Sequence, residues 1–166
     1  MKDFECFVTK GGILTEYRGC DRNVIIPKWI TIIDNYAFAR HPELESVTIS
    51  ESVSNIGDGA FLECSGLTNI IIPNSVLYIG FMAFSECTKL NSITIPKATT
   101  DLGPLAFDHC DGLKQIVMLN GDFALEPLTL GNSDMTIIAP AGGAVEKVAK
   151  EYGFKFEPLD SDRERQ

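Results

Sequence analysis

Residues 67–84 read LTNIIIPNSVLYIGFMAF, and the first half of this stretch has the pattern of a short strand. Ile70 and Ile72 stand two residues apart, so both side chains point to one face of an extended chain. Pro73 follows at once and ends the strand, because proline has no N–H to give to a sheet ladder. We therefore predict a short strand with one buried face.

The second half of the stretch predicts another extended piece and a turn. Val76 and Ile79 are apolar, and Gly80 directly after them indicates a turn. The Ala83-Phe84 pair then opens an arc that returns the chain to the next strand. We expect this arc to be a short helical or irregular turn.

The same pattern recurs along the chain with a step of 23 residues. The clearest columns that keep this step are Ala37, Ala60, Ala83 and Ala106; Phe38, Phe61, Phe84 and Phe107; Leu44, Leu67, Leu90 and Leu113; and Val47, Ile70, Ile93 and Ile116. No unit can bury its apolar side alone, so the units must stack in register, about 4.8 Å apart. The sequence therefore predicts a right-handed parallel β solenoid with short helical or irregular return arcs.

We expect one solenoid domain over residues 1–158 and a mobile polar tail over residues 159–166. The domain divides into an N-terminal cap, a run of 23-residue repeats, a degenerate repeat and a C-terminal cap. These four parts cover residues 1–23, 24–118, 119–140 and 141–158. Six rungs would make a stack of about 29 Å.

The two caps have their own patterns. Residues 4–8 and 13–17 flank a glycine pair and predict a β-hairpin. In the degenerate repeat, residues 135–140 resemble a final rung, although the step to it is 21 residues instead of 23. Residues 143–152 predict an amphipathic helix that stops at Gly153, and a last strand is expected over residues 154–156.

Composition and charge exclude several classes of partner. The 166 residues are 45% hydrophobic and carry a net charge of −9, which repels phosphate backbones and anionic lipid surfaces. We therefore expect no nucleic acid partner. No run of about 18 apolar residues is present, so we expect no membrane insertion. The N-terminus lacks the pattern of a signal peptide, which predicts a cytoplasmic location for the sequence as it stands; a removed leader would make the location secreted or cell surface.

The repeat unit resembles the bacterial BspA-type leucine-rich repeats. The resemblance covers roughly residues 13–158 and rests on the unit Leu67-x-x-Ile70-x-Ile72-Pro73-x-x-Val76-x-x-Ile79-Gly80-x-x-Ala83-Phe84. It implies a leucine-rich-repeat solenoid and a secreted or surface-anchored binding or adhesion module. The family has no catalytic residues to carry over to this chain.

One column holds residues that bind metals in other proteins, namely His41, Cys64, Cys87 and Cys110. Stacked rungs place its ends about 14 Å apart in a line, whereas zinc needs four donors that converge. We therefore predict a column of buried thiols and no metal site. A disulfide between neighbouring rungs, or between Cys6 and Cys20 in the N-terminal cap, stays open on spacing alone.

Catalytic signatures are missing from the sequence. It contains no G-x-S-x-G elbow, P-loop or C-x-x-C motif. The carboxylates of Glu43 and Glu45 fall on an expected exposed turn, where nothing would raise a pKa for acid–base catalysis. His109 occupies a column that is otherwise charged, so we expect it to be solvated. The sequence predicts a protein that is not an enzyme and uses no cofactor.

The candidate binding residues point outward between the buried residues of the first strand of each unit. They form two columns, Thr48, Ile71, Thr94 and Val117, and Ser46, Asn69, Ser92 and Gln115. Solenoids use such extended faces to bind partners. The alternative is that β-branched residues simply suit a strand.

A second candidate is an exposed apolar patch of Leu77, Tyr78 and Phe81, whose slots are polar in the preceding unit. A neighbouring loop or cap covering these side chains is the alternative. We thus expect a non-catalytic protein-binding module that presents the outward strand residues to a protein partner. The other hypotheses are a secreted or cell-surface adhesin that binds a host or matrix protein, and a structural element that self-associates through the patch.

Overall fold

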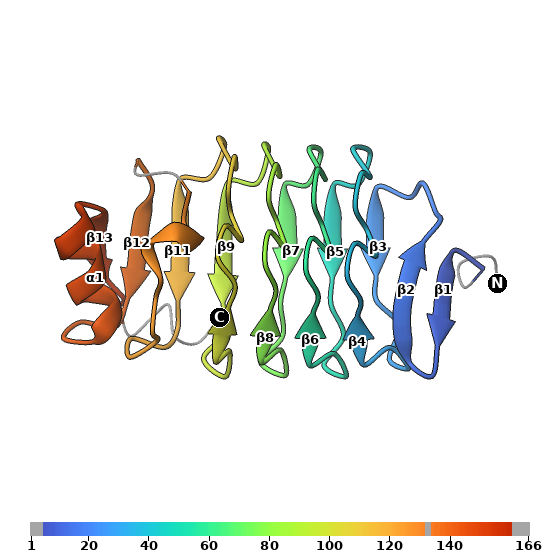
Figure 1. Ribbon diagram of the computed structural model, residues 1–166, viewed down its shortest axis with the longest axis horizontal. Coiled ribbons are helices and arrows are strands. Elements are labelled where there is room, and N and C mark those ends of the chain that lie inside the picture. Colours follow the sequence, from blue (N-terminus) through green and yellow to red (C-terminus); the bar gives the residue numbers. More distant parts are fainter. Residues whose placement is uncertain (1–4, 132–133, 161–166) are drawn as a thin grey trace.

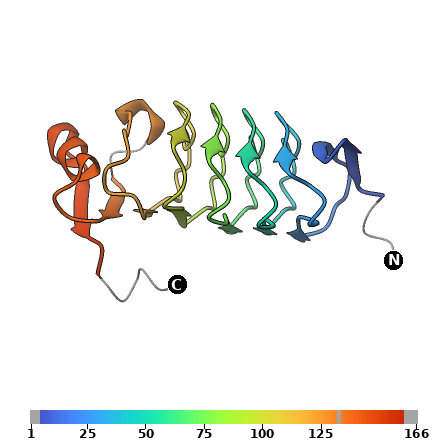
Figure 2. The ribbon, with the colours of Figure 1, turned by 90° about the horizontal axis from the view of Figure 1, so that it is seen from below.

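The structure is a computed structural model that describes residues 5–131 and 134–160. The chain forms a parallel β solenoid of about six turns with a helix at its C-terminal end (Figures 1 and 2). Each turn contributes strands to two sides of the solenoid, and an irregular arc forms the remaining side. The predicted fold class is confirmed.

Thirteen strands, one α-helix and one 3₁₀ turn are described. In chain order they are β1 (Phe7–Lys10), β2 (Ile13–Tyr17), β3 (Asn23–Ile25), β4 (Ile32–Ile33), β5 (Ser46–Thr48), β6 (Asn55–Ile56), β7 (Asn69–Ile71), β8 (Tyr78–Ile79), β9 (Ser92–Ile95), β10 (Asp101–Leu102), β11 (Gln115–Met118), η1 (Pro127–Thr129), β12 (Thr136–Ala139), α1 (Ala144–Tyr152) and β13 (Lys155–Pro158). No helix in the described ranges is both long and apolar enough to cross a membrane.

The strands form three sheets, because one side of the solenoid is divided. The second extended pieces of the units build one sheet in the order β1-β2-β4-β6-β8-β10. The first strands build two sheets on the other side, β3-β5-β7 and β9-β11-β12-β13. Except for the antiparallel β1–β2 hairpin, all pairs are parallel, as a stack of identical units requires.

The return arcs of the regular units are chains of tight turns, whereas the arc that follows β11 contains the 3₁₀ turn η1. Several residues in them adopt the left-handed conformation although they are not glycine, among them Arg40, Glu63 and Glu86 at the same slot of successive units. Backbone hydrogen bonds join each arc to the next, as from Phe38 N to Ala60 O (2.8 Å) and from Phe61 N to Ala83 O (2.8 Å). These hydrogen bonds stabilise the left-handed conformation, which is energetically unfavourable for residues other than glycine.

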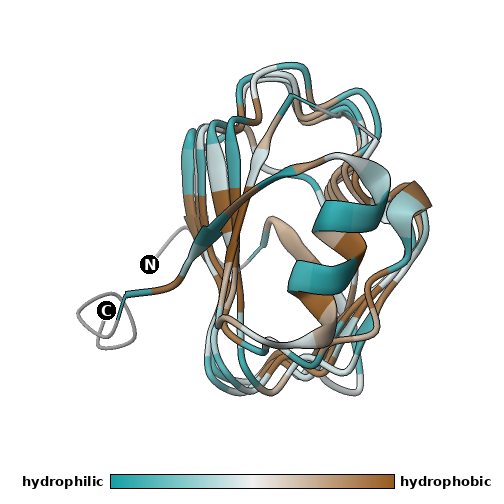
Figure 3. Ribbon diagram, turned by 90° about the vertical axis from the view of Figure 1, so that its left-hand side faces the viewer, coloured by the Kyte–Doolittle hydropathy of each residue, from teal (hydrophilic) through white to brown (hydrophobic). Residues whose placement is uncertain are grey.

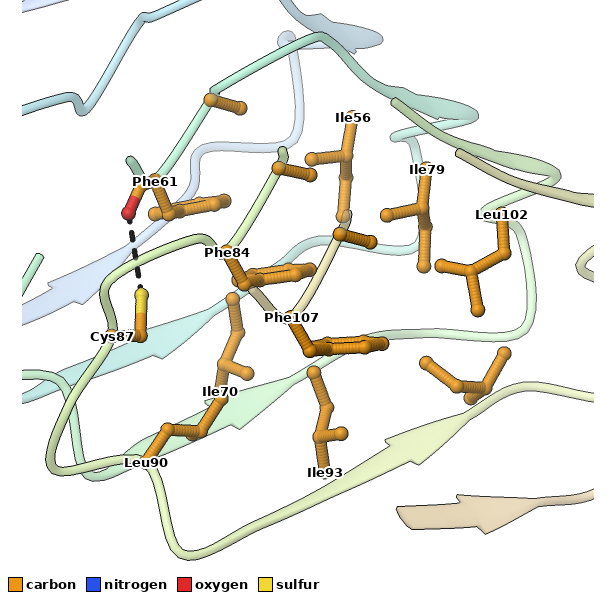
Figure 4. Close-up of a cluster of buried hydrophobic side chains, with 14 of the residues drawn as sticks. Ile56, Phe61, Ile70, Ile79, Phe84, Cys87, Leu90, Ile93, Leu102 and Phe107 are labelled. Atoms are coloured by element: carbon orange, nitrogen blue, oxygen red, sulfur yellow. Dashed lines mark hydrogen bonds between the residues drawn. The ribbon is translucent and has the colours of Figure 1, made fainter. Parts of the chain in front are cut away.

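The core is a ladder of stacked phenylalanine rings (Figure 4). The rings of Phe38, Phe61, Phe84 and Phe107 are fully buried, with successive centroids 5.0, 5.3 and 5.7 Å apart. Tyr17 from the hairpin stacks on Phe38 at 4.8 Å and so ends the ladder at the N-terminal side.

The predicted column of buried thiols lies beside the rings. Cys64, Cys87 and Cys110 are fully buried and free, and each Sγ donates to the phenylalanine carbonyl of the preceding arc, at 3.0 to 3.3 Å. Figure 4 shows the bond from Cys87 to Phe61. Burial raises the pKa of Cys64 and of Cys110 to about 12, so these thiols stay protonated. They pack as small apolar groups.

His41 occupies the slot of this column nearest the N-terminal cap and connects the cap to the first arc. Its Nε2 lies 3.0 Å from the carbonyl oxygen of Tyr17, and its Nδ1 lies 2.9 Å from a carboxylate oxygen of Glu43. His41 therefore has a structural role, as predicted, because its ring connects the end of β2 to the first return arc.

In the degenerate repeat the 23-residue step is kept as far as η1, further along the chain than predicted. Phe107 N donates to Thr129 O (3.2 Å), with the same 22-residue difference as from Phe61 N to Ala83 O, so η1 stacks on the preceding arc in the regular phase. The next strand pair, Ile116 with Ile137, has a step of 21. The two missing residues therefore fall after η1, in the return to β12, and the arc itself is preserved.

The C-terminal cap is α1 followed by β13, and α1 lies across the open end of the core (Figure 3). Val145 and Ala149 of α1 are buried, and Gly153 ends the helix in the left-handed conformation (φ 78°). β13 begins and ends slightly later than the predicted strand. The predicted polar tail lies outside the described residues from residue 161 on, and the predicted first hairpin strand does so at residue 4.

Candidate functional site: the outward strand face

The first column of predicted binding residues lies on the outer surface of β5, β7, β9 and β11. Thr48, Ile71 and Thr94 are exposed, and Val117 is half-buried. Thr48 pairs with Ile71 in register, and Thr94 pairs with Val117. The sheet ladders thus hold these side chains in two rigid pairs.

The second column runs beside the first. Ser46 pairs with Asn69, and Ser92 pairs with Gln115; Asn69 is exposed and the other three are half-buried. Neither column contains a carboxylate or a cation. We call the eight residues of the two columns the strand face. It is a neutral surface with hydroxyl, amide and aliphatic groups in fixed rows.

The strand face is divided between β7 and β9. These strands belong to different sheets, and no hydrogen bond of the sheet ladder joins them. The structure therefore brings β5 together with β7, and β9 together with β11, but leaves a seam between the two pairs. Figure 1 shows this wider interval in the row of arrows.

Two residues of β3 extend the strand face beyond the predicted columns. Asn23 pairs with Ser46 and Ile25 with Thr48, and the Ile25 side chain is 74% exposed. Both lie one 23-residue step before a predicted site residue, so extrapolating the columns would have found them. At the other end, Ile138 of β12 continues the column of Val117 but is 1% exposed, so the surface closes there.

The predicted apolar patch is at the surface, on and beside the sheet that the second extended pieces build. Leu77, Tyr78 and Phe81 are 47%, 37% and 38% exposed. Asp58 of the preceding turn fixes the last two, because its Oδ1 accepts from the Tyr78 hydroxyl (3.2 Å) and from Phe81 N (2.8 Å). Partial burial, followed by the nearby Asp58 charge, raises the pKa of Tyr78.

Apolar residues continue the patch toward the C-terminal end of the solenoid, beyond the three predicted residues. Phe81 shares its column with Pro104 and Pro127, and the residues next to these prolines are Leu105 and Leu128. Leu128 is 70% exposed. An apolar stripe therefore follows the corner of the solenoid from the patch to η1.

The remaining polar candidates have structural partners or lie in solvent. The hydrogen bond from His41 lowers the pKa of Glu43, so this carboxylate is poorly suited to donate a proton. His109 is exposed, and its nearest carboxylate oxygen, on Asp108, is 3.6 Å away. Cys6 is half-buried, Cys20 is exposed, and both are free thiols. Among the described residues, no three His, Cys, Asp or Glu side chains form a group that could hold a metal ion.

Comparison with solved structures shows the same solenoid in bacterial proteins. The pneumococcal vaccine antigen PcpA superposes with a TM-score of 0.77 at 17% identity, over 92% of this chain and 45% of PcpA. The Treponema protein TpLRR (T. pallidum) superposes with a TM-score of 0.60 at 18% identity, over 89% of this chain and 91% of TpLRR. A leucine-rich repeat protein of Bacteroides capillosus gives a TM-score of 0.58 at 25% identity, over 68% of this chain and 98% of that protein. The chain thus spans less than half the length of PcpA.

The sequence itself matches one family. Six copies of the BspA type leucine rich repeat are found between residues 17 and 131. Among curated proteins there is no significant match. A repeat fold of this kind is typical of proteins without catalytic activity, many of which bind other proteins. The chain belongs to the BspA-type leucine-rich repeat family.

Proposed function

We propose that this chain is a non-catalytic protein-binding module and that the strand face holds the protein partner. One observation carries the proposal: the strand face is an ordered, uncharged surface. Among its exposed side chains are Thr48 on β5, Ile71 on β7 and Thr94 on β9. Their backbones are already ordered by the solenoid, so binding a partner there costs little conformational entropy. The family supports the proposal, because leucine-rich repeats are commonly protein-interaction modules.

The test is affinity capture from a lysate of the native host, with the purified domain as bait and mass spectrometry as the readout. A Thr48→Glu, Thr94→Glu double variant should lose the partner, because each substitution places a carboxylate on the face. The matched control is Thr15→Glu with Thr88→Glu, since both threonines are exposed and lie elsewhere. Circular dichroism should show that both variants fold. Equal capture by the wild type and both variants would refute the strand face as the binding surface.

Self-association through the apolar patch is a second candidate function. The observation that favours it is the continuation of the patch along the corner to Leu128, which is 70% exposed. Light scattering should then show a mass that rises with concentration for the wild type and stays monomeric for Phe81→Glu. A wild-type monomer at high concentration would remove this candidate.

A cell-surface adhesin is a special case of the binding module. It is supported by the family alone, some of whose structural relatives are described as a vaccine antigen and a cell surface protein. Surface labelling and fractionation of the native host test it. Recovery of the protein only from the cytoplasmic fraction would refute it.

A further inference from the structure

The seam between β7 and β9 is an opening confined to the strand side of the solenoid. On the other sides the two rungs remain joined, because Gly103 N donates to Ile79 O (2.8 Å) and Phe61 N donates to Ala83 O (2.8 Å). The two rungs are therefore separated on the side of the strand face and remain hydrogen-bonded on the other two sides.

Hydrogen bonds that the neighbouring rungs make are missing at the seam. Ile49 N donates to Ile71 O (3.0 Å) across β5 and β7, but Ile72, at the same slot in the next rung, has no such bond to Thr94. Pro96 has no N–H with which to bond back across the seam, a feature that the paired β5–β7 rung shares at Pro73. The position that corresponds to Pro96 one rung later is Leu119, whose N donates to Ile95 O (3.1 Å). Backbone groups on the facing edges of β7 and β9 consequently have no partner in a sheet ladder.

Side chains at the seam are also less buried than elsewhere in the core. Ile72 is half-buried, whereas Ile49 and Ile95 in the same column are 3% and 1% exposed. A hollow of about 620 Å³ lies over this point, with Ile71, Ile72 and Leu119 among the residues that line it. The hollow is thus a depression with an apolar floor and unpaired strand edges.

The charge of the seam differs from that of the whole chain. Among the nine residues that line the hollow, Lys97 is the one charged residue, so the lining carries +1 while the chain carries −9. Acidic partners are repelled elsewhere and are tolerated best here.

Lys97 stands at the rim of the hollow and is available to a ligand. It is exposed, and within the described part of the chain it makes no ion pair. Its neighbours one step before and after are the amides Asn74 and Asn120, and Asn74 also lines the hollow. The adjoining hollow, lined by both Lys97 and Asp122, has a volume of about 420 Å³. Asp122, the one carboxylate that lines this adjoining hollow, makes no ion pair with Lys97 within 4.0 Å.

We propose that the seam is a peptide-binding site for a short extended acidic segment of a protein partner. An aliphatic side chain of the segment enters the hollow over Ile72, and a flanking carboxylate binds Lys97. Asn69 and Thr94, whose polar side chains also line the hollow, can hydrogen-bond to the segment. This inference rests on the proposed function and deepens it, since it names the kind of partner and the part of the strand face that binds it.

The test uses two pools of capped pentapeptides and the amide NMR spectrum of the ¹⁵N-labelled chain. Every peptide has Val, Ile or Leu at its centre, flanked on both sides by Asp or Glu in the acidic pool and by Lys or Arg in the basic pool. The acidic pool should shift the amide signals of Ile72, Thr94 and Lys97, and the basic pool should not. Lys97→Glu should weaken binding at least tenfold. The matched control Lys89→Glu, on the return arc, should change it less than twofold.

Three results would overturn the inference: no shift with the acidic pool, equal shifts with both pools, or equal weakening by the two lysine variants. Shifts confined to Thr48 and its neighbours would also overturn it while leaving the strand face as a binding surface. Conversely, seam binding together with a failed capture experiment would retain the peptide site and refute the wider protein-binding face.

Discussion

Truncation of one ring of the phenylalanine ladder should destabilise the solenoid strongly. Phe84 is 0% exposed, and its ring lies 5.3 Å from that of Phe61 and 5.7 Å from that of Phe107. Phe84→Ala removes the buried ring and leaves a cavity between two rungs that the sheet ladders prevent from collapsing. We expect a loss of about 3–5 kcal/mol in the free energy of unfolding. Of this, each lost stacking contact accounts for about 0.5–1.5 kcal/mol.

Urea denaturation measures this loss, with far-UV circular dichroism as the main readout. With a slope of about 2 kcal/mol per molar urea, a loss of 4 kcal/mol lowers the midpoint by about 2 M. The matched control is Phe81→Ala, because Phe81 is 38% exposed and belongs to the surface patch. This control should lose less than about 1 kcal/mol.

Repeat proteins can unfold in parts, so a second probe is needed. The single tryptophan, Trp29, precedes β4 in the N-terminal part of the stack and provides it by fluorescence. Coincident midpoints show that the loss applies to the whole domain. A loss below about 1 kcal/mol for Phe84→Ala, or a loss equal to that of the control, would refute the buried ring ladder.

Three further predictions follow from the seam, the thiols and the first arc. In hydrogen exchange, the Ile72 amide should exchange faster than that of Ile49, whose N–H donates to Ile71 O at 3.0 Å; equal protection would contradict an open seam. In the folded chain at pH 8, a maleimide should label exposed Cys20 rapidly and the three buried thiols only after urea is added, as mass spectrometry will show. His41 lowers the folded-state pKa of Glu43 below its unfolded value of 4.5, so the stabilisation is present above pH 4.5 and is lost as the pH falls through the lower folded value. Urea unfolding between pH 7 and pH 3 should show a smaller loss for Glu43→Gln than for the wild type, and identical pH profiles would contradict this role.

The candidate site could be predicted only in part from the sequence. Alternation along the first strand identified the residues that point outward, because side chains of a strand alternate between its faces. Ile25 is absent from the predicted columns, which begin at Thr48, although it lies one 23-residue step earlier and within the predicted repeats. Leu128 escaped because the step changes shortly after it, which obscured the regular phase of η1.

The sequence by itself determined the solenoid, the buried rings and the buried thiols. A step of 23 residues in several columns leaves one arrangement in which every unit buries its apolar side, and that arrangement is stacking in register. Burial of Phe84 and Cys87 follows from column membership alone, because each repeats at a slot that stacking places inside.

Only the tertiary structure decided where the stack is tight and where it opens. Ile70 and Ile93 belong to the same column as Val47, and nothing in their identity separates β7 from β9 while β5 stays paired with β7. Pairing depends on whether the backbones of two rungs come within hydrogen-bond distance, and that spacing is set by all sides of the solenoid together. The docking of Tyr17 and His41 is likewise a tertiary outcome, because it joins a hairpin outside the period to the first repeat.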